Sequence, residues 1–339
     1  MTVPIAPASA PVITPIPDAQ PRRIPASAAA ANFNADAVAH ITGSATVQQM
    51  IDEGAAQLTA AGVAFGHGTT NAQDEAAWLV LWQLGLPLDS PLEGQNSLSN
   101  MAFEQQIRRR VAHLFIARIA TRKPAAYLTQ EAWLQGVPFY VDERTIVPRS
   151  FIAELIAEGT IDPWLGEHTH RILDLCTGNG SLAVLAAMAW PEIVVDASDL
   201  SGAALEVARI NIDKHDLGER ISLHIADGMA SLPGPYDLIL CNPPYVNAQS
   251  MAKLPAEYRA EPELALAGGV DGMDFIRQLL RDAPERMTEN AVLVLEIGNE
   301  WEHFEAAFPT LPAFWLETSS GEDQVVLITR AALADYGFL

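Results

Sequence analysis

Apolar positions recur at helical spacing in the first third of the chain. From Thr46 onward they fall at steps of three, four and seven residues, which places them on one face of a helix. A second helix is predicted after Thr69-Thr70-Asn71, whose side chains are typical helix caps, and it ends near Gly85. A third helix is predicted from Met101 to Ala120. We expect these helices to form a small domain over residues 39–123.

The pattern changes twice further along. Between residues 124 and 150 apolar and polar residues alternate around Gly136 and Pro138, which predicts a β-hairpin linker. From 151 to 339, apolar runs typical of strands alternate with helical segments, and this alternation predicts a parallel, doubly wound α/β sheet. The predicted strands are 171–175, 194–199, 221–226, 236–241, 291–297, 313–317 and 324–329. The predicted helices are 150–158, 181–189, 201–215, 272–282 and 301–307.

Residues 1–38 show neither the helical nor the strand pattern of apolar positions. Proline and alanine dominate this segment, and it offers too few apolar side chains to offset the entropy of ordering. The sequence therefore predicts a disordered tail.

The charge balance narrows the classes of partner. The chain has 20 Lys and Arg against 42 Asp and Glu, a formal net charge of −22. Because affinity for nucleic acid comes mostly from basic side chains on phosphates, this charge disfavours a generic nucleic-acid binder and favours a basic partner. We see neither a membrane-spanning apolar run nor a secretory signal pattern. Two cysteines are too few for a zinc site or disulfide framework, so we expect no metal and a reducing, cytoplasmic setting.

One stretch departs from this acidic balance. Six basic residues cluster within the third predicted helix and directly after it: Arg108, Arg109, Arg110, Arg118, Arg122 and Lys123. Two interpretations remain open, a solvated helix face or a patch that contacts rRNA or an acidic surface.

A glycine-rich loop follows the first strand of the predicted sheet. The strand ends in Asp174-Leu175 and runs into Cys176-Thr177-Gly178-Asn179-Gly180 before a helix. Glycines let this backbone bend sharply and approach a ligand, and the spacing fits either a dinucleotide or S-adenosylmethionine. The acidic Asp174 favours S-adenosylmethionine, whose cationic methionine end it would face.

Two further carboxylates end the next strands. Asp199 can accept hydrogen bonds from both ribose hydroxyls, or it can cap the helix that follows. Asp227, beside Gly228, ends the third strand, where it would meet a nucleobase amino group or cap a loop.

The fourth strand ends in Asn242-Pro243-Pro244-Tyr245. An amide nitrogen is a poor nucleophile because its lone pair is delocalised, so its methylation requires the NH2 group to be held in line with a methyl donor. The side-chain oxygen of Asn242 and the carbonyl of Pro243 can accept hydrogen bonds from the two N–H groups of the target amide. Tyr245 can lie flat against the planar target group.

At these residues the chain resembles the amino methyltransferases that act on planar NH2 groups, and most closely the protein glutamine-N5 methyltransferases. The resemblance covers about residues 46 to 330 and also includes Val147-Pro148-Arg149, Tyr258-Arg259, Glu261 to Leu264 and Gly269 to Gly272. It implies a seven-stranded, Rossmann-like methyltransferase domain, using S-adenosyl-L-methionine, behind a helical substrate-recognition domain.

The resemblance also implies the roles of individual residues. Asn242, Pro243 and Tyr245 would be catalytic, and together with Pro244 they would hold a substrate glutamine. Arg149 would be structural or would line the cleft mouth, and Glu296 and Gly298 would support the cleft floor. The implied cofactor contacts are Asp174, Cys176, Thr177, Gly178, Asn179, Gly180, Asp199, Asp227, Gly228 and Asn242.

The segment after Pro148-Arg149 separates two subgroups. The release-factor type usually continues Pro-Glu-Thr-Glu, whereas this chain continues from Ser150 to Leu155 and is similar to the type that acts on large-subunit ribosomal protein L-three. Two positions depart from that type, which commonly has proline in place of Phe151 and histidine in place of Ala260. The rival functions are a release-factor methyltransferase, an rRNA or DNA amino methyltransferase, and a non-catalytic binding module.

Overall fold

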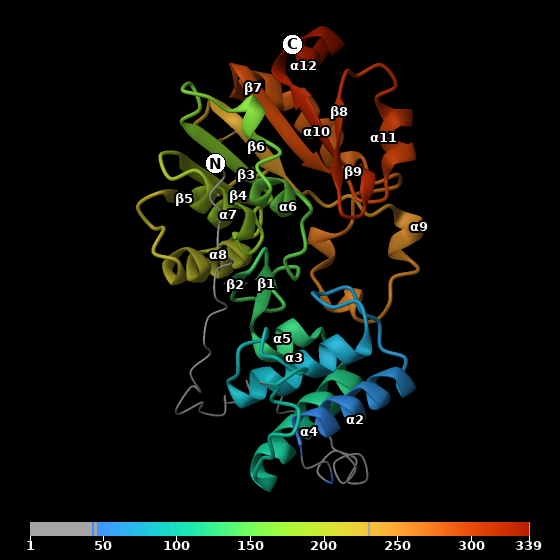
Figure 1. Ribbon diagram of the computed structural model, residues 1–339. Coiled ribbons are helices and arrows are strands. Elements are labelled where there is room, and N and C mark those ends of the chain that lie inside the picture. Colours follow the sequence, from blue (N-terminus) through green and yellow to red (C-terminus); the bar gives the residue numbers. More distant parts are fainter. Residues whose placement is uncertain (1–42, 44–45, 96, 230, 339) are drawn as a thin grey trace, which may run out of the picture.

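The computed structural model describes residues 43, 46–95, 97–229 and 231–338, so the predicted tail over 1–38 lies outside the described residues. Figure 1 shows two units, a group of helices at one end and a sheet flanked by helices at the other. Within the described part of the chain, no helix is both long and apolar enough to cross a membrane.

The helical unit contains α2 (Val47–Ala60), α3 (Ala72–Leu84), α4 (Gln105–Thr121) and α5 (Ala125–Thr129). As predicted, Thr46 and Asn71 cap the first two helices, and Gly85 ends α3 in a left-handed conformation. The prediction for the third helix was wrong at its start. It begins at Gln105 instead of Met101 because Met101 accepts a hydrogen bond from the Val47 amide (3.0 Å) and its neighbour pairs with Thr46.

The linker is a hairpin only in its middle. Strands β1 (Ala132–Leu134) and β2 (Val137–Phe139) pair antiparallel, as predicted. Tyr127 and Leu128, however, belong to the short helix α5 and not to a strand. Pro124 is the N-cap of α5, and Tyr127 is held inside by the hydrogen bond that its hydroxyl donates to the Thr145 carbonyl (2.5 Å).

The sheet has seven strands in the order β5-β4-β3-β6-β7-β9-β8. Six of them run the same way and β9 is antiparallel to both neighbours, which departs from the all-parallel prediction. The turn between β8 and β9 is too short for a crossover, so these two strands form a hairpin. The strands are β3 (Arg171–Leu175), β4 (Val194–Asp199), β5 (Ile221–Ile225), β6 (Tyr236–Cys241), β7 (Met287–Glu296), β8 (Phe314–Thr318) and β9 (Gly321–Thr329).

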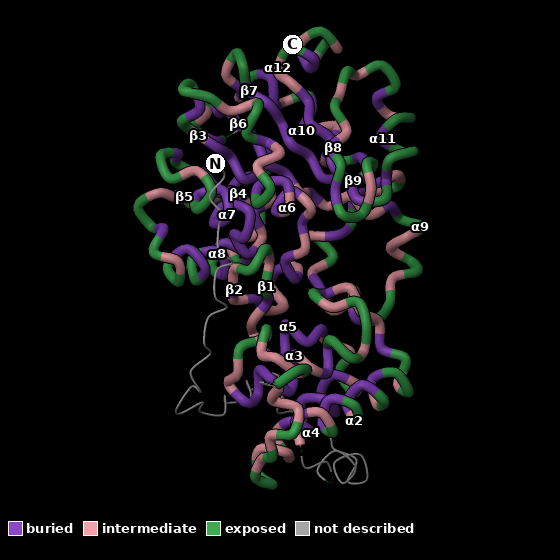
Figure 2. The backbone as a smooth tube through the Cα atoms, viewed as in Figure 1, coloured by how far each residue is buried: buried purple, intermediate pink, exposed green. Residues whose placement is uncertain are grey.

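Helices cover both faces of this sheet, and each face has its own core. On β3, Ile172 packs into the cluster that includes α6 and α7, whereas Leu173 packs into the cluster that includes α10. Figure 2 shows the strands as the most continuously buried part of the chain. The flanking helices are α6 (Ile152–Ala157), α7 (Ser181–Ala189), α8 (Gly202–Lys214), α10 (Asp274–Asp282), α11 (Trp301–Ala307) and α12 (Arg330–Leu333).

The segment after β6, which includes α9 (Ala248–Met251), runs from the sheet towards the helical unit (Figure 1). Its Glu257 accepts from Arg118 (3.2 Å) and Arg122 (3.4 Å) of the helical unit. Arg118 is fully buried and also pairs with Glu75 at 2.7 Å. The two ion pairs with Glu257 join residues more than 130 positions apart in the chain.

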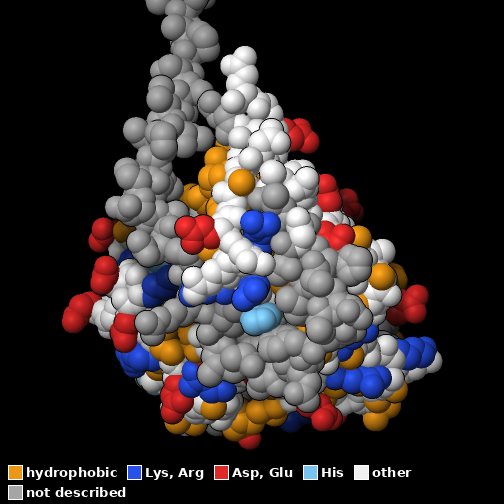
Figure 3. Space-filling model, turned by 90° about the horizontal axis from the view of Figure 1, so that it is seen from below, with side chains coloured by type: hydrophobic (Ala, Val, Ile, Leu, Met, Phe, Trp, Pro, Cys, Tyr) orange, Lys and Arg blue, Asp and Glu red, His pale blue; other side chains and the backbone are white. Residues whose placement is uncertain are grey.

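The basic cluster is therefore not a single exposed patch, and both interpretations of it were wrong for Arg118. Lys123 pairs with Glu143, and Arg122 is half-buried against Glu257. In Figure 3, which looks onto the helical end, the basic side chains that are visible lie among acidic and hydrophobic ones. Arg118 and Arg122 neutralise the buried carboxylates of Glu75 and Glu257, which are costly to leave unpaired.

Candidate active site

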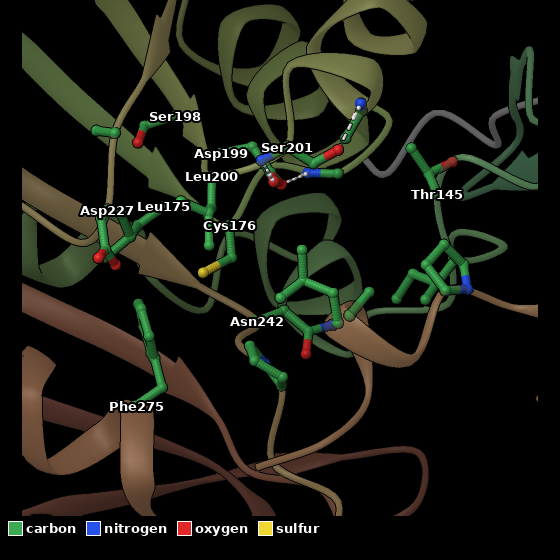
Figure 4. Close-up of a pocket in the computed structure, with 18 of the residues that line it drawn as sticks. Thr145, Leu175, Cys176, Ser198, Asp199, Leu200, Ser201, Asp227, Asn242 and Phe275 are labelled. Atoms are coloured by element: carbon green, nitrogen blue, oxygen red, sulfur yellow. Dashed lines mark hydrogen bonds between the residues drawn. The ribbon is translucent and has the colours of Figure 1, made fainter.

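A cavity lies at the carboxyl ends of β3, β4, β5 and β6 (Figure 4). A parallel sheet with helices on both faces has a crevice at this edge, where the connections that follow two adjacent strands run to opposite faces of the sheet. We name it the cofactor cavity. Seven of the residues selected from the sequence line it: Cys176, Gly178, Asp199, Asp227, Gly228, Asn242 and Pro244.

Four other selected residues do not line the cavity: Asp174, which lies behind the loop, and the loop residues Thr177, Asn179 and Gly180. Asp174 is fully buried and its Oδ2 accepts from the Thr177 hydroxyl (2.5 Å) and the Ala183 amide (2.9 Å). Burial raises the pKa of Asp174 to about 7, against the effect of these two hydrogen bonds. Its Oδ1 has no hydrogen-bond partner among the described residues. Asp174 thus holds the loop from behind, and its contact with the cofactor stays a prediction.

Gly180 brings two helices together. It precedes α7 in a left-handed conformation, and a Cβ there would meet Ala208 of α8 at 3.1 Å. Asn179 supports the same corner, because its carbonyl accepts from the buried Asn211 (2.8 Å). These contacts fix the loop so that Gly178 faces open space.

Asp199 connects the loop to the start of α8. Its Oδ2 accepts from the Gly178 amide (3.0 Å) and its Oδ1 accepts from the Ser201 amide (2.8 Å). The N-cap of α8 is Ser201, so the alternative prediction of Asp199 as this cap was wrong. Burial raises the pKa of Asp199, and the backbone hydrogen bonds oppose this shift.

The cavity suits a ligand with both polar and apolar parts. Asp199 and Asp227 lie along its sheet edge, and Leu200, Leu264 and Phe275 contribute apolar wall (Figure 4). The open space at Gly178 fits the close approach of S-adenosylmethionine to the loop backbone. Sequence reasoning missed Phe275 because its apolar side chain gives the same signal as a core residue of α10.

A second cavity lies beside the first, and we name it the acceptor cavity. It is lined by Asn242, Pro243, Tyr245, Arg149 and Tyr258, among others. Asn242 lines both cavities. Its carboxamide makes no hydrogen bond with the described part of the chain, so its donors and acceptor remain available to a ligand.

Three glycines hold Tyr245 in place. A Cβ on Gly298 would lie 2.5 Å from the Tyr245 ring, and a Cβ on Gly268 would lie 2.7 Å from its Cα. A Cβ on Gly272 would lie even closer to the Tyr245 carbonyl oxygen. The Tyr245 hydroxyl points at Glu296, 3.5 Å from Oε1. The glycine segment after residue 267 therefore packs directly on the Asn-Pro-Pro-Tyr turn.

Glu296 supports this floor, in agreement with its predicted role. It is buried and accepts from the Ser150 hydroxyl (2.5 Å) and the Phe151 amide (2.9 Å). Burial raises the pKa of Glu296 to about 7, although these donors oppose the shift. Glu296 thus joins the end of β7 to the segment after Pro148-Arg149.

Arg149 takes both of its predicted roles, because it lines the acceptor cavity and forms a structural ion pair. Its guanidinium makes two hydrogen bonds to Glu261 (2.5 and 2.7 Å) and lies 5.4 Å from the centre of the Tyr258 ring. Burial opposes ionisation of Glu261, but the neighbouring His67 and Arg149 lower its pKa to about 2. His67, from the helical unit, also packs against Tyr258, with the ring centroids 4.3 Å apart and the rings tilted by 49°.

The two cysteines are neighbours, as their positions at the ends of adjacent strands predict. Leu175 pairs with Cys241 across β3 and β6, so Cys176 follows directly beside it. Burial and the nearby Cys176 thiol raise the pKa of Cys241, which favours the neutral thiol. Across the described residues, no group of His, Cys, Asp and Glu has the arrangement of a metal site.

The seven-stranded sheet, the glycine-rich loop and the Asn-Pro-Pro-Tyr turn together define an S-adenosylmethionine-dependent methyltransferase fold, and the methyltransferase small domain family matches residues 160–257. Similarity to curated proteins extends over most of the chain. The chain is 50% identical over 293 residues to the ribosomal protein uL3 glutamine methyltransferase of Bordetella pertussis, covering 85% of this chain and 96% of that protein. The protein of the same name from Burkholderia pseudomallei is 49% identical, with 85% and 95% covered. The chain belongs to the family of ribosomal protein uL3 glutamine methyltransferases.

Proposed function

We propose that this protein transfers one methyl group from S-adenosyl-L-methionine to the side-chain nitrogen of a glutamine in ribosomal protein uL3, the L-three protein of the large subunit. The observation that carries the proposal is the meeting of the cofactor and acceptor cavities at Asn242. A methyl donor in one cavity and an amide in the other would meet at this side chain.

The chain's own residues would act by positioning. The Asn242 side-chain oxygen and the Pro243 carbonyl accept hydrogen bonds from the two N–H groups of the substrate amide. This leaves the nitrogen lone pair facing the cofactor cavity. Pro243 has no N–H, so it offers only an acceptor. The ring of Tyr245, which Gly298 and Glu296 hold, lies beside the planar amide.

The cofactor supplies a methyl group on a cationic sulfonium, which already contains a good leaving group. The residues proposed to hold it are Asp199, Asp227, Gly228 and the loop from Cys176 to Gly180, with Asp174 behind the loop. No strong base is required, because the methylated amide is a strong acid and loses its proton to water.

Charge at the site supports a protein acceptor over a nucleic acid. Two arginines line the two cavities, and both are paired with carboxylates, Arg149 with Glu261 and Arg144 with Asp142 and Glu206. Little positive charge is therefore left for a phosphate backbone. We propose that the helical segment over 39–123 recognises the substrate, that residues 124–150 link it to the methyltransferase domain over 151–339, and that the reaction takes place in the cytoplasm.

The test is methyl transfer from tritiated S-adenosylmethionine to separated, unmethylated ribosomal proteins, release factors and rRNA. We expect label on one glutamine of uL3. Asn242→Ala should lower kcat by about a hundredfold or more, because positioning of the reacting groups is lost. Asn290→Ala, an exposed asparagine on β7, is the matched control and should leave kcat unchanged.

Three outcomes would overturn the proposal: label in rRNA, label in a release factor in place of uL3, or wild-type turnover in Asn242→Ala.

A further inference from the structure

The acceptor cavity continues into a groove on the surface. Leu254, Tyr258 and Leu266 line both the acceptor cavity and this groove, whose volume is about 430 Å³. Met251 extends the apolar floor, and Arg259 and Glu263 lie on the exposed rim. A side chain that reaches Asn242 from outside can therefore leave its backbone neighbours in the groove.

A short segment forms the wall between this groove and the cofactor cavity. Along it, Pro262, Leu264 and Ala265 line the cofactor cavity, whereas Glu261, Glu263 and Leu266 line the groove. The segment contains the single 3₁₀ turn Glu263–Ala265. The segment thus separates the cofactor cavity from the groove. It follows shortly after Glu257 in the chain, which contacts the helical unit.

The charged residues that line the groove differ in whether they already have a partner within the protein. Glu261 is neutralised by Arg149, and its pKa is lowered to about 2. Arg259 donates to the Ala252 carbonyl at 3.3 Å, within the groove's own backbone. Glu263 is exposed and has no ion-pair partner in the described part of the chain. It is the carboxylate on this rim that an incoming cation can reach.

We propose that this groove binds the stretch of substrate polypeptide next to the acceptor glutamine, and that Glu263 pairs with a Lys or Arg of that stretch. The inference rests on the proposed function and names the part of the site that selects the substrate sequence. Its occupant follows from the continuity with the acceptor cavity, from the apolar floor of Met251, Leu254 and Leu266, and from the free carboxylate. Ribosomal proteins are rich in Lys and Arg because they bind RNA phosphates, so a carboxylate on the rim complements them.

The test compares two charge reversals in the full-length protein, with intact uL3 as substrate. Glu263→Lys should raise KM for uL3 about tenfold and leave kcat almost unchanged, because a rim charge selects partners without entering the chemical step. The affinity for S-adenosylmethionine, measured by calorimetry, should also be unchanged. Glu289→Lys carries the same change on an exposed residue of β7 and should alter none of these values.

A reciprocal change in the substrate makes the test specific. The Lys and Arg residues within four positions of the methylated glutamine are replaced one at a time by Glu. One replacement should raise KM for the wild-type enzyme and restore a low KM for Glu263→Lys. Met251→Glu, which places a charged side chain on the apolar groove floor, should raise KM for uL3 even though Glu263 and its substrate partner are both present.

The outcomes separate this inference from the proposed function. If the wild-type enzyme methylates uL3 but Glu263→Lys and Glu289→Lys have equal KM values and no reciprocal pair is found, the groove assignment is wrong and the function stands. If the wild-type enzyme leaves uL3 unlabelled, the proposed function fails. Label in rRNA would overturn both.

Discussion

At the scale of single residues, the site depends on small side chains as much as on polar ones. Asn242 supplies the hydrogen-bonding groups, but the position of Tyr245 is set by Gly298, Gly268 and Gly272, each of which leaves no room for a Cβ. Gly298 also has φ of +54°, which favours glycine. These glycines lie outside the Asn-Pro-Pro-Tyr motif and act through the packing of its last residue.

This packing gives a prediction for Gly298→Ala. The added methyl group would lie 2.5 Å from the Tyr245 ring and must displace it. We expect kcat for uL3 methylation to fall about tenfold or more, since a displaced ring misaligns the acceptor amide, while the affinity for S-adenosylmethionine stays near wild type. Steady-state kinetics and calorimetry measure the two effects.

Gly218→Ala is the matched control, because a Cβ at this exposed glycine meets nothing within 4 Å. Equal kcat values for the two variants would show that Tyr245 does not depend on Gly298.

At the scale of elements, one buried arginine joins the helical unit to the site. Arg118 on α4 donates to Glu75 of α3 and Glu257 of the segment after β6, and its Nη2 donates to the Ala64 carbonyl (2.8 Å). Burial raises the pKa of Glu75, and Arg118 opposes this shift. The next residues of the same segment, Tyr258 and Glu261, contact His67 and Arg149 at the acceptor cavity.

Arg118→Met should therefore destabilise the protein strongly. It leaves the buried Glu75 without its cation and Glu257 with only the longer pair to Arg122, and removing one partner of a buried ion pair typically costs about 3–5 kcal/mol in the free energy of unfolding. Guanidinium denaturation followed by circular dichroism measures the change. Arg109→Met, on the exposed side of the same helix, should change the free energy of unfolding by less than about 0.5 kcal/mol. A similar small change for both variants would contradict the structural role given to Arg118.

At the scale of the whole molecule, the net charge of −22 acts on association rather than on the fold. A basic substrate is attracted over distances of about a Debye length, roughly 10 Å at 0.1 M salt. The net charge of −22 would therefore speed the encounter with the basic substrate, and the carboxylate of Glu263 would pair with a substrate cation once the substrate is bound.

Steering of this kind predicts a strong dependence on salt. Raising the salt from 50 to 300 mM should lower kcat/KM for uL3 about tenfold, because long-range attraction is screened. The affinity for S-adenosylmethionine should change little, since its contacts lie inside the cofactor cavity. Stopped-flow association and calorimetry at matched salt concentrations test this. A kcat/KM that is independent of salt would mean that the net charge plays no part in substrate encounter.

Much of the architecture was determined by the sequence alone, because apolar periodicity and turn residues are local signals. The seven strands, the main helices and the loops at Gly178 and Asn242 follow from such patterns, and the structure confirms them. Local patterns were less informative at element ends. Met101 pairs with the backbone beside Thr46, and Tyr127 lies in a helix, since both depend on contacts with distant segments.

Only the tertiary structure decided which charged residues are free and which are internal. The sequence presents Arg118 and Arg122 as part of a basic run, whereas folding places them against Glu257, more than 130 residues away. The same folding places Asp174 behind its loop and aligns the groove, the acceptor cavity and Asn242 in one continuous space. Spacing along a chain specifies the elements, but burial and ion pairing depend on which elements meet, and that is settled by packing.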